Sequence, residues 1–303
     1  MITSGFNISA VERDTGLSKD VLRVWERRYG FPLPERDPQG ERLYSDAQIE
    51  RLRLIKRLMD QGYRPGKLIP MDADALLSLT PKNRKTSPMP ANDEREELLG
   101  LLELIKQNDA NGYQEAMHQR LARQGLEHFV QDTIAPLTRE VGEAWEDGRF
   151  EVFEEHLFTE LTKRLLRQSI VNLPNGRRGP RIILTSVPDE QHILGLLMVE
   201  VLLALEGAEC VPLGTQMPVV DIARAAVAHQ VDVVALSFSA AFPARQIPSL
   251  LQQLRTLLPE SVALWVGGAG VARLPEIVGV LYLSGLEQIT RSVQDWREIR
   301  QAS

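Results

Sequence analysis

Five short apolar runs recur between residues 181 and 283, and their spacing constrains the fold more than any other feature. The runs are RIILTSV (181–187), ECVPL (209–213), VVALSFS (233–239), ALWVG (263–267) and VLYL (280–283). Amphipathic stretches of about 10–15 residues lie between them, as in chains where strands alternate with helices. Because the runs are apolar along their whole length, the strands should be covered on both faces. The sequence therefore predicts a doubly wound α/β domain with a parallel sheet over residues 176–303.

Two turn-rich stretches divide the rest of the chain. TPKNRKTSPMPAN (80–92) holds three prolines and few apolar residues, a composition typical of a linker. LPNGRRGP (173–180) separates helical from strand-like sequence. Residues 93–175 contain few helix-breaking positions, so we predict a helical bundle there, and residues 1–79 form a further domain. The predicted breaks in the bundle are Asn108-Asp109, Gly125, Ala135-Pro136 and Asp147-Gly148.

Composition excludes several classes of protein. No run approaches the roughly 18 apolar residues of a membrane span, and residues 1–9 lack the pattern of a secretory signal. The single cysteine, Cys210, excludes an internal disulfide, a cysteine zinc site and an iron–sulfur cluster, and it fits a reducing cytoplasm. The net charge is −6, yet residues 1–70 carry 13 Lys and Arg against 10 Asp and Glu, while the others carry 22 against 31. A basic head on an acidic body predicts that the head binds a polyanion.

Local signals in the head predict short helices around a β-loop. Ser18 can cap a helix that ends at Gly30, and Ser45 can begin another. Between these helices FPLPERDPQGERLY (31–44) holds three prolines and Gly40, which forbid a helix and favour a β-loop. The pattern LSKDVLRVWERRYGFPLPER…GERLYSDAQI resembles the MerR family of winged helix-turn-helix transcription regulators over residues 6–75.

This resemblance implies that the head binds double-stranded operator DNA through one helix and one wing. Arg23, Arg27 and Arg28 lie on one short helix, where basic side chains can reach phosphates and base edges in a major groove. Arg42 in the wing can reach the neighbouring DNA backbone. Trp25 fits a core position and a contact beside the DNA equally well. The full set of candidate DNA-binding residues is Lys19, Arg23, Trp25, Arg27, Arg28, Arg36, Arg42 and Tyr44.

A second motif follows the first predicted strand. Glu190, His192 and Gly195 form E-x-H-x-x-G at the carboxyl end of that strand, where open α/β sheets bind ligands. The motifs Ser237-Phe238-Ser239 and Gly267-Gly268 follow at the ends of two later strands. Together the three motifs resemble the D-x-H-x-x-G…S-x-L…G-G signature of the Rossmann-like cobalamin-binding domain in methionine synthase and corrinoid mutases, over residues 180–300.

The resemblance implies a role for each of these residues. His192 would coordinate the cobalt of cobalamin in place of the cofactor's own dimethylbenzimidazole, and Glu190 would hold the other imidazole nitrogen. Ser237 would hydrogen-bond the displaced base in its slot. Gly267 and Gly268 would leave room for the nucleotide tail, because no Cβ intrudes.

The bundle carries a third motif, in which Trp145 is followed after nine residues by Glu155-His156. W-x9-E-H resembles the helical cap of cobalamin photoreceptor repressors of the CarH/LitR group. The resemblance implies that Trp145 and Glu155 pack around the 5′-deoxyadenosyl group of adenosylcobalamin. Taken alone, the motif is more typical of a core tryptophan beside an exposed Glu-His pair.

The chain departs from these families at three positions. Glu190 replaces an aspartate, and Ser239 replaces a leucine and is expected to alter the slot for the base. Glu146 stands where the best-known photoreceptors have a histidine that binds cobalt after light breaks the cobalt–carbon bond. The light product of this chain is therefore expected to differ from theirs.

These motifs predict a cytoplasmic, cobalamin-dependent transcriptional regulator and not an enzyme. By resemblance it would be a repressor that binds DNA in the dark, as a homo-oligomer (dimer or tetramer) with adenosylcobalamin, and releases the DNA in light. Two alternatives stay open. One is a cofactor-independent regulator that uses the cobalamin fold for oligomerisation or partner binding, and the more remote one is a corrinoid methyl-carrier component of an enzyme.

Overall fold

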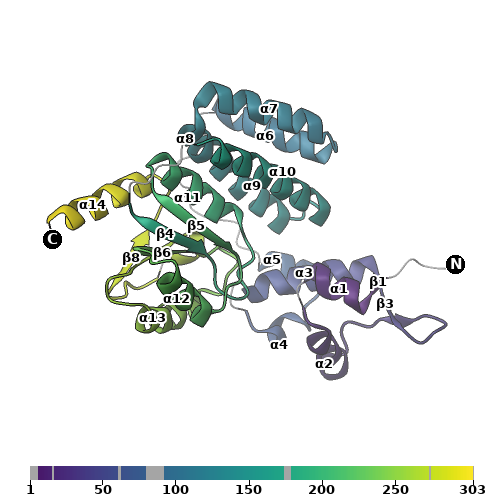
Figure 1. The fold of residues 1–303 in the computed structure, drawn as a ribbon. Coiled ribbons are helices and arrows are strands. Elements are labelled where there is room, and N and C mark those ends of the chain that lie inside the picture. Colours follow the sequence, from purple (N-terminus) through teal and green to yellow (C-terminus); the bar gives the residue numbers. More distant parts are fainter. Residues whose placement is uncertain are drawn as a thin grey trace. The chain divides into compact units, whose positions relative to one another are not determined.

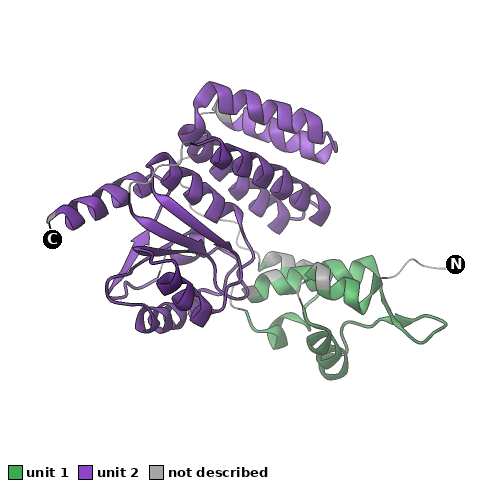
Figure 2. Ribbon diagram, viewed as in Figure 1, with its two compact units in different colours: residues 1–87 green, residues 88–303 purple. Residues whose placement is uncertain are grey.

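The computed structural model describes residues 6–15, 17–60, 63–79, 92–173, 179–272 and 274–302. The chain forms two compact units, residues 1–87 and residues 88–303 (Figure 2). Most of the predicted linker at 80–92, and the predicted boundary between residues 175 and 176, lie outside the described residues. No helix in the described ranges is long and apolar enough to cross a membrane.

The first unit combines short helices with a three-stranded antiparallel sheet of order β1-β3-β2 (Figure 1). Its elements are β1 (Phe6–Asn7), α1 (Ile8–Thr15), α2 (Lys19–Tyr29), β2 (Glu35–Arg36), β3 (Arg42–Tyr44), α3 (Asp46–Asp60), α4 (Pro65–Leu68) and α5 (Ala73–Ser78). The predicted cap is confirmed, because the Ser18 hydroxyl accepts a hydrogen bond from the Val21 N–H at the start of α2. Gly30 ends α2 with φ 70°, a left-handed conformation that favours glycine. The β-loop is confirmed as the hairpin of β2 and β3.

Residues 92–171 of the second unit form the predicted helical bundle. Its elements are α6 (Asn92–Lys106), α7 (Ala110–Gln124), α8 (Leu126–His128), the π-helix η1 (Phe129–Ile134), α9 (Ala135–Glu146) and α10 (Val152–Val171). Three of the predicted breaks are confirmed, but the break at Ala135-Pro136 is wrong. The Ala135 N–H donates to the Val130 carbonyl, five residues back, so the turn before the proline is a wide π turn. That wider turn accommodates a proline, which lacks an N–H and crowds an ordinary helical turn.

The predicted α/β domain is confirmed as a parallel sheet of five strands in the order β5-β4-β6-β7-β8. The strands β4 (Arg181–Thr185), β5 (Glu209–Gly214), β6 (Val233–Ser237), β7 (Ala263–Gly267) and β8 (Val280–Leu283) fall on the five apolar runs. The helices of this domain are α11 (Leu194–Leu205), α12 (Val219–Ala228), η2 (Ala244–Gln246), α13 (Ile247–Leu257), η3 (Ala269–Val271) and α14 (Gln288–Ala302). The sheet is doubly wound, with α11 and α14 on one face and α12 and α13 on the other (Figure 1).

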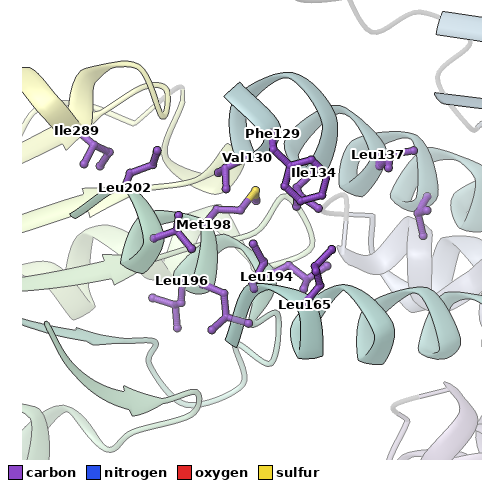
Figure 3. Packing of buried hydrophobic residues seen from close by; sticks show 14 of the residues in the cluster. Phe129, Val130, Ile134, Leu137, Leu165, Leu194, Leu196, Met198, Leu202 and Ile289 are labelled. Carbon is purple, nitrogen blue, oxygen red and sulfur yellow. The ribbon is translucent and has the colours of Figure 1, made fainter. Parts of the chain in front are cut away.

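One hydrophobic core joins the bundle to the sheet domain. Figure 3 shows Phe129, Val130, Ile134, Leu137 and Leu165 of the bundle beside Leu194, Leu196, Met198 and Leu202 of α11. The sequence of α11, LGLLMVEVLLAL, is apolar on most of its sides, and a helix of this kind is buried on most of its sides. Accordingly, α11 packs against both the bundle and the sheet strands. Because α11 begins two residues after His192, the bundle and the predicted ligand loop are joined to the same helix.

An ion pair with one buried partner crosses the same interface. Glu200 of α11 is 5% exposed, and its carboxylate lies 3.1 Å from the Arg167 guanidinium of α10. Burial raises the pKa of Glu200, and the charge of Arg167 opposes that rise. The pair fixes the position of α10 along α11, because sliding either helix would leave a buried carboxylate without its partner.

Candidate functional site

Two loops at the carboxyl end of the sheet form the candidate site. The strands β4 and β6 are neighbours, but the chain leaves β4 for β5 on one side before it returns to β6 on the other. Open α/β sheets bind ligands in the crevice where successive connections diverge in this way. The loop after β4 (186–193) carries Glu190 and His192 of E-x-H-x-x-G, Gly195 lies in the first turn of α11, and the loop after β6 (238–243) carries Ser239.

The carboxylate of Glu190 joins these two loops. It is 1% exposed. Its Oε1 accepts hydrogen bonds from the backbone N–H of His192 at 3.0 Å and from ring Nδ1 at 2.7 Å. Its Oε2 accepts from the backbone N–H of Ser239 at 2.7 Å and from the hydroxyl at 2.8 Å. Burial alone would raise the pKa of Glu190, but the hydrogen bonds from His192 and Ser239 outweigh it and hold that pKa below its ordinary value.

His192 is the exposed member of this arrangement. Its side chain is 61% exposed, although the carboxylate that holds it is buried. An ionised carboxylate only accepts hydrogen bonds, so Nδ1 carries the proton and Nε2 carries the lone pair in the neutral ring. An imidazole that a carboxylate holds in one tautomer is the usual arrangement of a metal-ligating histidine.

Ser186 anchors the backbone of the same loop, and none of the sequence motifs includes it. Its fully buried hydroxyl donates to the Glu190 carbonyl at 2.6 Å and accepts from the Gln216 N–H at 3.0 Å. Asp189, just before Glu190, has φ 69°, a left-handed backbone that is uncommon outside glycine. The turn is therefore tied through Ser186 to the loop after β5 and through Ser239 to the loop after β6.

The motif residues Gly195 and Ser237 are brought together. A Cβ on Gly195 would stand 2.9 Å from the Ser237 hydroxyl, which is closer than side chains pack. The hydroxyl of Ser237 thus lies directly over the first turn of α11. A side chain at position 195 would force the Ser237 hydroxyl to move.

The two glycines at the end of β7 lie where other parts of the backbone come close. A Cβ on Gly267 would stand 3.3 Å from a carbonyl oxygen of β8. Gly268 has φ 96° and ψ 167°, and a Cβ there would collide with the Phe238 carbonyl oxygen. Gly270, which the motifs do not include, is crowded in the same way by the Ser239 carbonyl. The protein's own backbone therefore requires glycine at positions 268 and 270 and leaves little room for a side chain at 267, a reason separate from the predicted room for a nucleotide tail.

The predicted cap residues lie at the end of α9 and the start of α10. Trp145 is partly buried and packs against the core that joins the bundle to α11. Glu155 is partly buried, and its carboxylate accepts a hydrogen bond from the Thr159 hydroxyl at 2.8 Å. His156 is 73% exposed, with Nε2 3.7 Å from the Glu155 carboxylate. All three belong to the same compact unit as His192.

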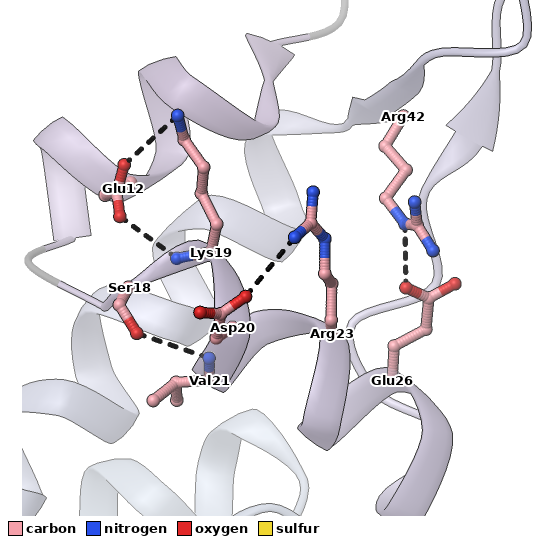
Figure 4. Close-up of polar contacts among 8 residues, drawn as sticks. All are labelled: Glu12, Ser18, Lys19, Asp20, Val21, Arg23, Glu26 and Arg42. Atoms are coloured by element: carbon pink, nitrogen blue, oxygen red, sulfur yellow. Dashed lines mark hydrogen bonds and ion pairs between the residues drawn. The ribbon is translucent and has the colours of Figure 1, made fainter.

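The predicted cations of the head differ in how they are engaged. The exposed ones are Arg23, Arg27, Arg28 and Arg36. Arg23 pairs with Asp20 on the same helix at 3.3 Å, and Lys19 pairs with Glu12 of α1 at 3.5 Å (Figure 4). Exposed pairs of this kind are weak, so these side chains can exchange their partners for a phosphate.

Arg42 of the wing is engaged inside the head. Its Nε donates to the Glu26 carboxylate at 2.8 Å (Figure 4), and both side chains are partly buried. This hydrogen bond raises the pKa of Arg42. This contact between Arg42 and Glu26 joins β3 of the wing to α2, and we call it the clamp. In this structure Arg42, which the sequence predicts to contact DNA, is thus bonded to Glu26 of the head itself.

The two aromatic candidates of the head lie in its core. Trp25 is 5% exposed and Tyr44 is fully buried. This structure gives Tyr44 no exposed surface that could contact a duplex, and the contact between Tyr44 and DNA stays a prediction. The sequence allows Trp25 either a core position or a contact beside the DNA, and in this structure Trp25 lies in the core.

Three stretches of the chain match family models. Residues 6–69 match the model described as MerR HTH family regulatory protein. Residues 98–168 and residues 180–282 each match a model described as B12 binding domain. The three matches fall on the head, the bundle and the sheet domain.

Two repressors of Myxococcus xanthus are similar to most of the chain. The HTH-type transcriptional repressor CarH is 31% identical over 269 residues, which cover 87% of this chain and 89% of that protein. The HTH-type transcriptional repressor CarA is 29% identical over 297 residues, which cover 97% of each. Among solved structures, the monomethylamine corrinoid protein of Methanosarcina barkeri has a TM-score of 0.54 at 18% identity, and covers 67% of this chain and 99% of that one. At this identity the structural similarity concerns the fold alone.

Proposed function

This chain belongs to the MerR family of transcription regulators, as a member that carries cobalamin-binding domains, and we propose that it is a repressor that binds operator DNA with adenosylcobalamin and releases it in light. It is a cobalamin-binding transcriptional regulator and not an enzyme, as its similarity to CarH and CarA indicates. The adenosyl form of the cofactor and the response to light are proposed from the W-x9-E-H motif. The observation that carries the proposal is the buried Glu190 carboxylate that holds one exposed imidazole.

The residues at the sheet edge fit the lower side of a cobalamin. An exposed histidine whose other nitrogen is held by a carboxylate would suit as a ligand to cobalt. His192 would supply Nε2 to the metal, while Ser237 and Gly195 would line the slot for the displaced base. When bound, the cofactor supplies a cobalt that accepts the imidazole and, in the adenosyl form, a cobalt–carbon bond that light breaks.

The bundle would cover the upper side of the cofactor. Trp145 offers an indole that the core already fixes, and Glu155 offers a carboxylate that can accept hydrogen bonds from a ribose hydroxyl. A ligand that contacts both the bundle and the loop after β4 favours the state in which α10 packs on α11. Glu146 ends α9 directly after Trp145, so the neighbouring side chain there is a carboxylate and not an imidazole.

The head would bind operator DNA through α2 and the wing. Arg23, Arg27 and Arg28 are exposed on α2, and a helix that presents basic side chains in this way can enter a major groove. Arg36 of the wing donates to the Gly40 carbonyl at 2.7 Å, which keeps its guanidinium at the hairpin. Symmetric operators are bound by symmetric dimers, so we expect a homodimer or a tetramer as the DNA-binding form.

The clamp between Glu26 and Arg42 should act on DNA binding by holding the wing against α2. Glu26→Gln removes the ion pair but keeps every cation, and we expect operator binding to weaken by about threefold to fivefold, the value of one partly buried pair. Arg42→Ala should weaken binding to a similar extent and leave the salt dependence unchanged. Arg23→Ala is the control, since loss of a phosphate contact lowers the slope of log K against log salt by about 1.

Fluorescence anisotropy with a labelled operator duplex, at several salt concentrations, measures both quantities. If Arg42 contacts phosphate directly, Glu26→Gln will instead strengthen binding, because it removes a negative charge and releases the guanidinium. A lowered salt slope in Arg42→Ala would lead to the same conclusion.

The proposed function is tested by gel shift on the chain's own promoter DNA, in the dark and in light, with and without adenosylcobalamin. We expect a retarded complex in the dark with adenosylcobalamin and its loss on illumination. Methylcobalamin in the dark is the matched ligand control, and it should give a weaker complex because the adenosyl contacts to the bundle are missing. Equal binding without any cobalamin would contradict the proposal and support a regulator that uses the cobalamin fold for oligomerisation or partner binding.

A further inference from the structure

Ser239 bonds to Glu190, the other residue of this edge at which the chain departs from the cobalamin-domain signature. Its N–H and its hydroxyl both donate to Oε2, at 2.7 Å and 2.8 Å. The two residues lie 49 positions apart in the chain, on the loops that follow neighbouring strands. The two residues that differ from the signature, Glu190 and Ser239, are therefore bonded to each other.

The length of the glutamate matters for this contact. One methylene more than aspartate lets the carboxylate of Glu190 lie between His192 and Ser239 and bond to both. A leucine at position 239 would keep the backbone N–H but remove the hydroxyl, and it would place apolar atoms against a buried charge. The carboxylate would then lose one of the donors that hold it in place.

We propose that Ser239 is a positioning residue for His192, which holds the Glu190 carboxylate and through it fixes the tautomer and the direction of the imidazole. This inference rests on the proposed function, in which His192 ligates cobalt. The side chain of His192 is 61% exposed, so packing contributes little to its orientation and hydrogen bonds must supply it. Outer partners of metal-ligating histidines change metal affinity by about 10- to 100-fold.

Ser186 provides a comparison within the same turn. Ser186, which is fully buried, also bonds to Glu190, but its hydroxyl donates to the backbone carbonyl rather than to the carboxylate. Loss of the Ser186 hydroxyl should therefore loosen the turn, whereas loss of the Ser239 hydroxyl should act on the group that holds the ring.

The test is Ser239→Ala in the full chain, titrated with hydroxocobalamin in the dark and followed by visible absorbance. We expect binding about tenfold weaker than in the parent, and Ser239→Thr, which keeps the hydroxyl, to bind within about twofold of the parent. Ser249→Ala is the control, because Ser249 is exposed on α13 and donates only to the Gln246 carbonyl of its own turn.

A second readout needs no cofactor. Nitrogen-15 NMR of the imidazole rings of the five histidines reports the tautomer of each ring. The signal that disappears in His192→Ala belongs to His192. We expect one tautomer, with the proton on Nδ1, in the parent, in Ser239→Thr and in Ser186→Ala. Ser239→Ala should give a mixture of tautomers.

Parent-like affinity and a single tautomer in Ser239→Ala would overturn the proposal. An equal loss of affinity in Ser239→Thr would do the same, because it would mean a merely structural role. If Ser239→Ala does not fold, Glu190→Asp and Ser239→Leu decide the question. Each alone should weaken binding, and the double variant, which has the pairing of the family signature, should recover part of the loss; additive losses would contradict the inference.

His192→Ala separates this inference from the proposed function. Its matched control is His229→Ala, since His229 is an exposed histidine at the end of α12. If both histidine variants bind cobalamin as the parent does, cobalt ligation by His192 itself is wrong. If His192→Ala alone loses affinity and Ser239→Ala does not, only the positioning role fails.

Discussion

Gly268→Ala is expected to lower the free energy of unfolding of the second unit by about 2–6 kcal/mol. Gly268 has φ 96° and ψ 167°, a region that is populated almost only by glycine, and another residue there costs about 1–3 kcal/mol. The new Cβ would also collide with the Phe238 carbonyl oxygen. That oxygen belongs to backbone that bonds to Gly270, so it cannot rotate away, and such overpacking costs about 1–3 kcal/mol more.

Gly125 provides the matched control for this prediction. It has nearly the same backbone, with φ 76° and ψ 160°, but no atom lies within 4 Å of the place where its Cβ would stand. Gly125→Ala should therefore lose only the conformational part, about 1–3 kcal/mol. Urea unfolding of both variants, followed by tryptophan fluorescence, measures the difference. Equal losses would show that the Phe238 carbonyl moves aside at little cost.

Arg167→Ala is expected to destabilise the second unit by about 2–3 kcal/mol at neutral pH, because it leaves the Glu200 carboxylate buried without its partner. The loss should fall below that for a fully buried pair, since Arg167 is itself about half-exposed. The same change removes the contact that fixes α10 along α11. Limited proteolysis should therefore cut the bundle faster in the variant than in the parent.

The loss should also depend on pH, in a direction that follows from the pKa of Glu200. Burial raises this pKa above its ordinary value of 4.5, so the folded state binds the proton more tightly than the unfolded state. The contribution of this group to stability is therefore greatest below pH 4.5, and it is lost as the pH rises from there through the folded pKa. In Arg167→Ala the pKa of Glu200 in the folded state rises further, because the opposing charge is gone. The pH range over which the variant loses stability therefore extends to higher pH.

Glu200→Gln supplies the control, because glutamine keeps the shape of the side chain and does not titrate. The double variant Arg167→Ala/Glu200→Gln should be more stable than Arg167→Ala at about pH 8, and the two should converge toward about pH 5. Urea unfolding across this range gives the comparison. A loss in Arg167→Ala that is the same at every pH would mean that the buried charge is not its cause.

Sequence patterns predicted the elements whose signals are local. Ser18 and Gly30 bound α2 as expected, and the five apolar runs became the five strands of the parallel sheet. Pro136 was the exception. The π turn before it buries Phe129 and Ile134 in the core shared with α11, and no pattern confined to one helix reports such packing.

The candidate site could be predicted from its loops but not from all of its contacts. Glu190 and His192 are two residues apart, so their hydrogen bond follows from a motif. The bond from Ser239 depends on β4 and β6 being neighbours, which a reading of single positions does not show, and Ser239 therefore counted only as a departure. The burial of Tyr44 is a related case, because a position in a family pattern can serve the core as well as the surface.

The strand order also governs when the site comes into being during synthesis and folding. Although β4 and β6 are adjacent in the sheet, the chain between them forms α11, β5 and α12. Pairing of strands so distant in sequence is slow, whereas helices joined by short turns form fast, so the bundle can condense before the sheet is complete. Until β6 has joined β4, Glu190 has no Ser239 to bind and the imidazole of His192 has no fixed direction. The growing chain therefore cannot form the contact between Glu190 and Ser239 until β6 has been made and has paired with β4.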